Sequence, residues 1–152
     1  MAQPEKITAR EAPSRKLDRV RVLLVEDERI IREIVVRLLK AIGVREVTEA
    51  ATAEDGWRLL VGQDQQTFHV LITDLTLPGA SGGTLVKKLR ELPYPRAKTF
   101  PVIVLTGSND LETYKLVEPW GISSYLIKPV SADLLRSAIE KAVFPETPKE
   151  PT

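Results

Sequence analysis

The chain has 152 residues, of which 43% are hydrophobic, and its formal net charge is +1. This composition suffices for one domain with a hydrophobic core and excludes both a disordered chain and a small fold that depends on disulfides. The sequence contains no cysteine, which excludes thiolate catalysis and metal sites with cysteine ligands. No apolar run could cross a membrane and the amino terminus does not resemble a secretory signal, so we expect a cytoplasmic protein.

The two ends of the sequence differ in composition from its middle. Residues 1–19 are predicted to be a flexible basic leader, and residues 144–152 a flexible, proline-rich tail. The basic residues of the leader are scattered and no aromatic residues lie between them, so we expect no direct binding to nucleic acid. A single domain is predicted over residues 20–143, with no second domain.

Apolar runs predict five strands, near residues 21–25, 45–49, 69–73, 101–105 and 124–127. Most of these runs are continuously apolar rather than alternating, which is typical of strands that helices cover on both faces. Amphipathic segments lie between them, so the sequence predicts a doubly wound α/β fold with a parallel sheet.

Helical spacing of apolar residues predicts five helices. They lie at about 30–42 with Gly43 after the end, from Thr52 to about 61, at 83–92, at about 109–118, and at 131–143. The segment 93–101 contains three prolines and is predicted to be an irregular loop.

Polar side chains follow four of the apolar runs directly. Glu26 and Asp27 follow the first run, Asp74 ends the third, Thr106 ends the fourth and Lys128 follows the fifth. Because the carboxyl ends of parallel strands lie at one edge of a sheet, we expect these side chains to converge in the crevice where open α/β sheets bind ligands.

Carboxylates in such a crevice repel one another, by about 4 kcal/mol for two charges at ~4 Å and an effective dielectric constant of 20. A divalent cation would remove this repulsion, and oxygen ligands favour Mg²⁺, or Mn²⁺, over Zn²⁺. Mg²⁺ in proteins commonly binds phosphate oxygens as well. Asp74 is therefore a candidate nucleophile for a phosphoryl group, with the Thr106 hydroxyl and the Lys128 ammonium as candidate contacts to the phosphoryl oxygens.

The order of these residues resembles the receiver domain of two-component response regulators over about residues 20–143. The shared features are an acidic pair, an Asp followed by Leu-Pro-Gly, a Thr, and Tyr-x-x-Lys-Pro. The resemblance implies a (βα)₅ flavodoxin-like fold with five parallel strands in the order 2-1-3-4-5. Within that family, the chain is similar to the single-domain chemotaxis regulators.

The resemblance also implies roles for individual residues. Asp74 is the implied phosphorylation site; Glu26, Asp27, Asp74 and the backbone carbonyl of Thr76 are the implied Mg²⁺ ligands. Thr106 and Lys128 are implied to contact the phosphoryl group.

Two further features of the fifth predicted strand follow from the resemblance. Tyr125 takes the place of an aromatic switch residue that acts with Thr106, and the Lys128–Pro129 peptide is implied to be cis. We expect Lys128 to gain a partner only when phosphoryl oxygens arrive. The chain departs most from the family pattern at residues 119–122 (Pro-Trp-Gly-Ile).

The implied function is that of a signalling receiver. A histidine kinase or a phosphotransfer protein would donate a phosphoryl group to Asp74. The output face would comprise the predicted helix 109–118, the strand 124–127 and the helix 131–143, and it would bind a downstream protein or a second copy of the chain. We expect no membrane insertion and no enzymatic activity beyond self-catalysed phosphoryl transfer and autodephosphorylation.

Other interpretations remain open on the sequence alone. The chain could be a receiver-like interaction module that is never phosphorylated, or an aspartyl phosphatase, although that class uses a second Asp where Thr76 stands. A flavin-binding protein could use residues 106–109 to hold phosphate. Singly, Glu26 and Asp27 could cap a helix, and Asp74 could form an Asx turn.

Three more residues have simpler predicted roles. His69 is predicted to be a strand-edge residue rather than a ligand or phosphate carrier, and Trp57 a packing residue. Trp120 is either part of the core or an exposed contact for a partner.

Overall fold

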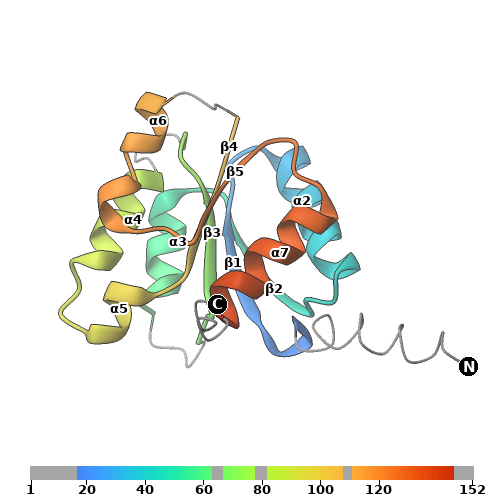
Figure 1. The fold of residues 1–152 in the computed structure, drawn as a ribbon, viewed down its shortest axis with the longest axis horizontal. Coiled ribbons are helices and arrows are strands. Elements are labelled where there is room, and N and C mark those ends of the chain that lie inside the picture. Colours follow the sequence, from blue (N-terminus) through green and yellow to red (C-terminus); the bar gives the residue numbers. More distant parts are fainter. Residues whose placement is uncertain (1–16, 63–66, 78–81, 108–110, 146–152) are drawn as a thin grey trace, which may run out of the picture.

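The computed structural model describes residues 17–62, 67–77, 82–107 and 111–145, and its centre is one parallel sheet (Figure 1). The strand order is β2-β1-β3-β4-β5, and every neighbouring pair is parallel. This arrangement confirms the predicted doubly wound five-stranded fold. The strands are β1 (Arg21–Val25), β2 (Glu46–Ala50), β3 (Val70–Asp74), β4 (Val102–Thr106) and β5 (Ser124–Ile127).

Helices cover both faces of the sheet, and alternate strand residues supply two hydrophobic cores. Helices α2 (Arg29–Ala41) and α7 (Ala132–Val143) cover one face, where they pack on residues such as Leu24 and Ile72. Helices α3 (Ala53–Leu60), α4 (Gly82–Arg90) and α5 (Pro95–Thr99) cover the other, where they pack on residues such as Leu23 and Val104. Figure 1 shows these two helical layers on either side of the sheet. This double coverage explains the continuous apolar runs of β1, β3 and β4.

The helix boundaries largely follow the predicted signals. Thr52 caps α3 by accepting a hydrogen bond from the Asp55 amide at 3.0 Å, and Ser131 caps α7 by accepting one from the Leu134 amide at 3.1 Å. Gly43 has a φ of 110°, as expected after the end of a helix. Three strands begin one residue later than predicted, and α4 spans 82–90 rather than 83–92.

The start of the domain differs from the prediction. Leu17–Arg19 form a short 3₁₀ helix, η1, and the Leu17 side chain is fully buried in the core beneath α2 and α7. The predicted leader of residues 1–19 therefore includes a core residue at its end. Residues 1–16 and 146–152 lie outside the part of the chain that the structure describes.

The prediction of an irregular loop over 93–101 is wrong, because Pro95–Thr99 form the short helix α5. Pro95 stands at the start of this helix, where its fixed φ is already helical and its missing N–H has no partner to lose. Ala97 is buried in the core. Burial of this face therefore overrides the low helical tendency of the segment.

The predicted helix over 109–118 is also shorter than expected. Helix α6 spans Leu111–Lys115, and a 3₁₀ helix, η2, spans Glu118–Trp120. The amides of Leu116 and Val117 donate to carbonyls three residues back, so the helix has already tightened before Pro119. Residues 108–110, where the start was predicted, lie outside the described residues. None of the described helices is both long and apolar enough to cross a membrane.

Candidate functional site

The predicted polar residues lie together at the carboxyl edge of the sheet because the backbone ladder extends past the strands. The Glu26 amide donates to the Ala50 carbonyl at 3.0 Å, and the Lys128 amide donates to the Thr106 carbonyl at 2.7 Å. Asp74 is the last residue of β3 and lies next to Leu105 of β4. Four adjacent strands, β1, β3, β4 and β5, therefore hold the backbone of the site.

The acidic residues form a compact cluster. One carboxylate oxygen from each of Glu26, Asp27 and Asp74 lies within 4.8 Å of the others. Glu26 and Asp74 are buried, with exposed fractions of 1% and 4%. Oxygen donors at this spacing, without nitrogen or sulfur ligands among them, fit a hard cation such as Mg²⁺.

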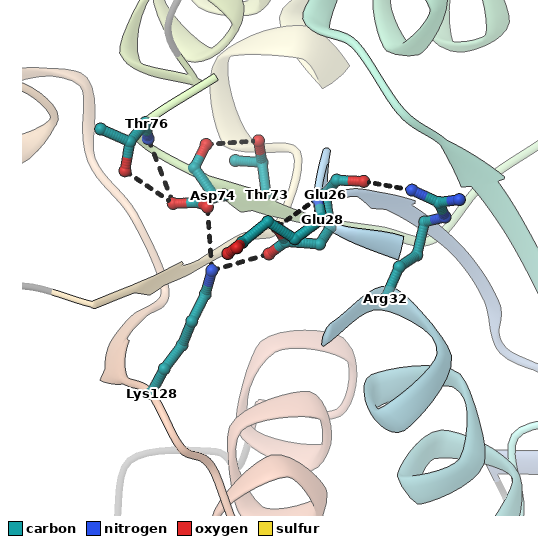
Figure 2. A network of polar contacts seen from close by, with 7 residues as sticks. All are labelled: Glu26, Glu28, Arg32, Thr73, Asp74, Thr76 and Lys128. Atoms are coloured by element: carbon teal, nitrogen blue, oxygen red, sulfur yellow. Dashed lines mark hydrogen bonds and ion pairs between the residues drawn. The ribbon is translucent and has the colours of Figure 1, made fainter. Parts of the chain in front are cut away.

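Lys128 enters the cluster from the strand-five side (Figure 2). Its Nζ lies 2.8 Å from Glu26 Oε1 and 2.9 Å from Asp74 Oδ2. The expectation that Lys128 gains a partner only with a phosphoryl group is therefore wrong. Three carboxylates in one crevice already attract an ammonium, which offsets part of their repulsion.

Asp74 is held through both carboxylate oxygens. Oδ1 accepts hydrogen bonds from the Thr76 amide at 3.1 Å and the Thr76 hydroxyl at 3.2 Å, while Oδ2 faces Lys128. The bond to the Thr76 amide has the two-residue spacing of an Asx turn, so that predicted local role and the cluster coexist. The Thr73 hydroxyl donates to the Asp74 carbonyl at 3.0 Å. A Cβ on Gly82 would lie 1.9 Å from that same carbonyl oxygen, so only glycine permits this close approach of α4.

This environment shifts the pKa values of two residues, Glu26 and Lys128. Burial raises the pKa of Glu26 and the neighbouring Asp74 charge adds to the rise, although the hydrogen bond from Lys128 opposes it. Burial tends to lower the pKa of Lys128, but its hydrogen bonds to Glu26 and Asp74 outweigh this and leave the pKa above its ordinary value. The ammonium is therefore firmly retained, while Glu26 resists ionisation.

Helix capping does not account for the acidic pair. Glu28, not Glu26 or Asp27, is the residue at the cap of α2, and its side chain makes no capping hydrogen bond. Glu26 Oε2 instead accepts a hydrogen bond from the Glu28 amide at 3.1 Å. This contact orients the Glu26 carboxylate toward the cluster.

Arg32 is a site residue that the sequence analysis missed. Its Nη1 donates to the Glu26 carbonyl oxygen at 2.8 Å, and its Nε lies 3.2 Å from Glu49 Oε1 on β2. Figure 2 shows Arg32 reaching from α2 to the Glu26 carbonyl. The carbonyl belongs to the peptide that joins Glu26 to Asp27, so Arg32 fixes the backbone that carries Asp27. The sequence signal for this role was the position of Arg32 in the first turn of the helix that follows the acidic pair.

The acidic cluster opens into a cavity of about 610 Å³. One end is polar and contains Asp27, Asp74 and Lys128, whereas the wall toward α2 and the residues after β5 is apolar. This apolar wall consists of Ile31, Ile34, Val35, Pro129 and Val130. The site can therefore accept a charged group while an apolar surface lies beside it.

Thr106 and Tyr125 lie on the face of the sheet opposite α2. Thr106 is buried at the end of β4, and Tyr125 pairs with Val104 across the β4–β5 ladder. Tyr125 is half-buried and packs edge to face on Tyr114 of α6, with ring centroids 5.1 Å apart. This aromatic contact, which the sequence analysis did not predict, joins β5 to α6.

The remaining predictions about single features can be placed. The Lys128–Pro129 peptide is cis, as the family resemblance implied. His69 lies at the amino end of β3, where its Nδ1 accepts a hydrogen bond from the Arg21 amide at 2.9 Å. Trp57 and Trp120 both pack partly buried against the core. The alternative that residues 106–109 hold the phosphate of a flavin falls partly outside the described residues, which do not include 108 and 109.

Comparison with known proteins gives consistent matches. A family model for the response regulator receiver domain matches residues 22–140. The chain is 30% identical over 122 residues to chemotaxis protein CheY of Pseudomonas aeruginosa, which covers 80% of this chain and 94% of that protein.

Two solved structures give the same result. A response regulator receiver domain protein from Clostridium thermocellum matches with a TM-score of 0.72 and 30% identity, over 82% of this chain and 94% of that chain. A CheY-like receiver domain protein from Methanospirillum hungatei matches with a TM-score of 0.68 and 30% identity, over 81% and 93% of the two chains.

Proposed function

Since this chain belongs to the family of response regulator receiver domains, we propose that it accepts a phosphoryl group on Asp74 and that the added charge alters a protein-interaction face. The observation that carries the proposal is the joint placement of Asp74, the acidic pair and Lys128 at one crevice. These four charged side chains come from three separate parts of the sequence. A shared chemical role explains why the fold brings them together at a buried edge.

The proposed reaction is transfer from a phosphohistidine of a histidine kinase or phosphotransfer protein. An Asp74 carboxylate oxygen attacks phosphorus, a P–O bond forms, and the P–N bond breaks with its electron pair returning to the imidazole. The Thr76 contacts to Oδ1 orient the carboxylate, and Oδ2 is the oxygen that Lys128 must release or share.

Mg²⁺ fits the donor set of this crevice, and Glu26, Asp27, Asp74 and the Thr76 backbone carbonyl are the proposed ligands. When bound, it would neutralise charge on the phosphoryl oxygens and the carboxylates. Mn²⁺ would fit the same oxygens. Lys128 and the Thr106 hydroxyl are the proposed protein contacts to the phosphoryl oxygens, which are stronger acceptors than the carboxylate they replace.

The apolar wall of the crevice supports a protein donor. Ile30 and Ile34 of α2 are 67% and 49% exposed, and Ile34 lines the cavity beside Asp74. A donor whose histidine reaches Asp74 would cover these side chains. Burial of apolar side chains by a partner is typical of the core of a protein interface.

We propose that the output face comprises α6, β5 and α7. Leu111, Ile127 and Leu134, one from each element, are exposed apolar residues. Within this face, the Tyr114–Tyr125 contact joins α6 to β5. Strand β5 pairs in turn with β4, which ends at Thr106. A downstream protein or a second copy of the chain would bind there, and phosphorylation would shift the balance between two arrangements of this face.

The same geometry argues against an aspartyl phosphatase acting on a separate substrate. Thr76 stands where that class uses an acid, and its hydroxyl donates to Asp74. We propose that the chemistry is confined to transfer onto Asp74 and hydrolysis of the aspartyl phosphate.

Intact mass spectrometry after incubation with acetyl phosphate and Mg²⁺ tests the proposal. The wild-type protein should gain the mass of one phosphoryl group, and Asp74→Asn should gain none. Asp133→Asn, at an exposed position on α7, is the matched control and should behave as wild type. An equal gain in Asp74→Asn would overturn the assignment, and no gain in wild type with acetyl phosphate or a phosphohistidine donor would favour an interaction module that is never phosphorylated.

A further inference from the structure

Arg90, the last residue of α4, has a buried guanidinium group that contacts three peptide carbonyls. Its Nε donates to the Trp120 carbonyl at 2.7 Å, its Nη2 to the Gly121 carbonyl at 2.6 Å, and its Nη1 to the Ala97 carbonyl at 3.0 Å. The residue is only 9% exposed. One side chain thus joins α4 to α5 and to the connection between η2 and β5.

A second cation completes this arrangement. The Lys98 ammonium donates to the Arg90 carbonyl at 2.6 Å. Carbonyls near the end of a helix lack partners within the helix, and both contacts supply such partners. The ends of α4 and α5 are therefore bonded to each other in both directions.

The connection held by Arg90 is a sharp joint of two residues, Trp120 and Gly121. Gly121 has a φ of +74°, which favours glycine, and its amide donates to the Glu118 carbonyl at 3.2 Å. The Lys87 ammonium lies 5.8 Å from the centre of the Trp120 ring, and the ring packs against the core. Helix α4 therefore contacts the backbone of this joint through Arg90 and the Trp120 ring through Lys87.

We propose that Arg90 is a positioning residue that anchors the joint at Trp120 and Gly121 and keeps it still when Asp74 is phosphorylated. This inference rests on the proposed function of the α6, β5 and α7 face. Moving the joint by an ångström would lengthen two charge-assisted hydrogen bonds at once, and the third bond to Ala97 keeps the guanidinium from following.

The anchor divides the segment between β4 and β5 into two parts. The part before the joint contains α6 and carries the exposed Leu111, and the part after it leads into Tyr125. With the joint fixed, rearrangement driven from Thr106 is confined to α6 and the residues around it. Arg90 thereby sets which portion of the output face can change.

Hydrogen exchange of the unphosphorylated protein tests the anchor directly. Arg90→Lys keeps the charge but cannot span the carbonyls as the planar guanidinium does. The amides of residues 120–123 should exchange about tenfold faster in this variant, as expected for the loss of charge-assisted hydrogen bonds, while those of β1 and β3 remain unchanged. Arg96→Lys is the matched control, since Arg96 donates to the Phe68 carbonyl at 3.2 Å, away from the joint.

The second arm uses Trp120 as a reporter in a Trp57→Phe background, which leaves one tryptophan. Beryllofluoride with Mg²⁺, a mimic of the phosphoryl group, should change exchange around α6 in the protein with Arg90 but leave Trp120 emission constant. In Arg90→Lys the emission should shift on activation, while the rate of phosphorylation at Asp74 stays as in the parent.

Distinct results would overturn the anchor and the proposed function. Equal acceleration of exchange in every element of Arg90→Lys, or none at residues 120–123, would show that Arg90 contributes only general stability. A Trp120 shift on activation in the protein with Arg90 would show that the joint moves. If beryllofluoride changes nothing in the parent, the proposed function fails, and the exchange of the unphosphorylated proteins still decides whether Arg90 anchors the joint.

Discussion

Lys128 follows β5 and Arg90 ends α4, and both are largely buried cations, yet their partners differ in kind. Lys128 contacts two carboxylates, at 2.8 and 2.9 Å. Arg90 contacts three neutral peptide carbonyls, at 2.6 to 3.0 Å. Carboxylates can be protonated, bound by a metal or converted to an acyl phosphate, whereas a peptide carbonyl keeps its charge under all these changes.

This difference indicates which region of the molecule can respond. Any ligand that neutralises Glu26 or Asp74 alters the free energy of the Lys128 ammonium, because electrostatic interactions are stronger at a buried site of low dielectric constant. The same ligand leaves the partners of Arg90 unchanged. The contacts of Lys128 therefore depend on what binds to the site. The contacts of Arg90 do not, so the region around Arg90 should keep its structure.

The largest expected effect at the responsive site comes from removing a metal ligand. Asp27→Ala removes an oxygen and a negative charge from the cluster, so Mg²⁺ affinity should fall by about 100-fold, measured by calorimetry. Arg90→Lys should bind Mg²⁺ as the wild type does. Unchanged affinity in Asp27→Ala would mean that Asp27 is not a ligand.

Substitution of the lysine separates metal binding from the response. Lys128→Ala removes a cation that competes for Glu26 and Asp74, so Mg²⁺ affinity should rise, by about threefold to tenfold. The effect of beryllofluoride on amide shifts around α6 and Tyr125 should nevertheless be lost, since no ammonium follows the new oxygens. Lys141→Ala, on the exposed side of α7, is the control. Full retention of the shifts would exclude Lys128 as the coupling residue.

Glu26 should make the metal-free stability depend on pH. Its pKa is raised above 4.5 in the folded protein, so the folded state holds its proton to higher pH than the unfolded chain does. Stability therefore falls as pH rises through this window, and the loss remains at neutral pH. Glu26→Gln removes it.

Urea unfolding without metal measures this effect. Relative to wild type, the unfolding free energy of Glu26→Gln should rise between pH 4 and pH 7, because only the wild type loses stability as the Glu26 carboxyl ionises. Glu54→Gln, at an exposed position of α3, should show no such trend. An equal difference between Glu26→Gln and wild type at both pH values would contradict the prediction.

The smallest effect concerns Arg32, where two mechanisms predict opposite signs. Loss of a positive charge near the acidic cluster should strengthen Mg²⁺ binding, but loss of its bond to the Glu26 carbonyl should weaken it by releasing the backbone of Asp27. We expect the second to prevail, with Arg32→Met weakening Mg²⁺ binding about threefold. Arg37→Met removes the same charge from an exposed position of α2 without that bond. Tighter binding in Arg32→Met would show that charge dominates.

The sequence was sufficient to predict the strands and the residues at their carboxyl ends. The apolar runs before Asp74 and Thr106 are buried on both faces, so their pattern follows from the fold, and parallel strands bring their ends to one edge. The helix starts at Thr52 and Ser131 were predicted because they depend on local interactions, namely the capping hydrogen bonds of these side chains.

The errors and omissions arise where contacts between residues far apart in the sequence determine the local structure. Helix α5 forms because Ala97 is buried and Arg90 bonds its carbonyl, and neither fact can be read from the prolines around it. The contacts of Lys128 with Glu26, 102 residues away, and of Arg90 with Gly121, 31 residues away, depend on the completed fold. Periodicity reports which side of an element is buried, but not which polar atoms meet there.

The position of His69 has a consequence for how signals reach Asp74. It is the single histidine of the sequence, and it precedes β3 whereas Asp74 ends it, a separation of roughly 16 Å at about 3.3 Å per residue. Its Nδ1 is occupied by the Arg21 amide, and burial together with the charges of Arg96 and Arg21 lowers its pKa. No histidine within these 152 residues can hand a phosphoryl group to Asp74. In the proposed transfer, the phosphohistidine that donates to Asp74 is therefore a residue outside this sequence.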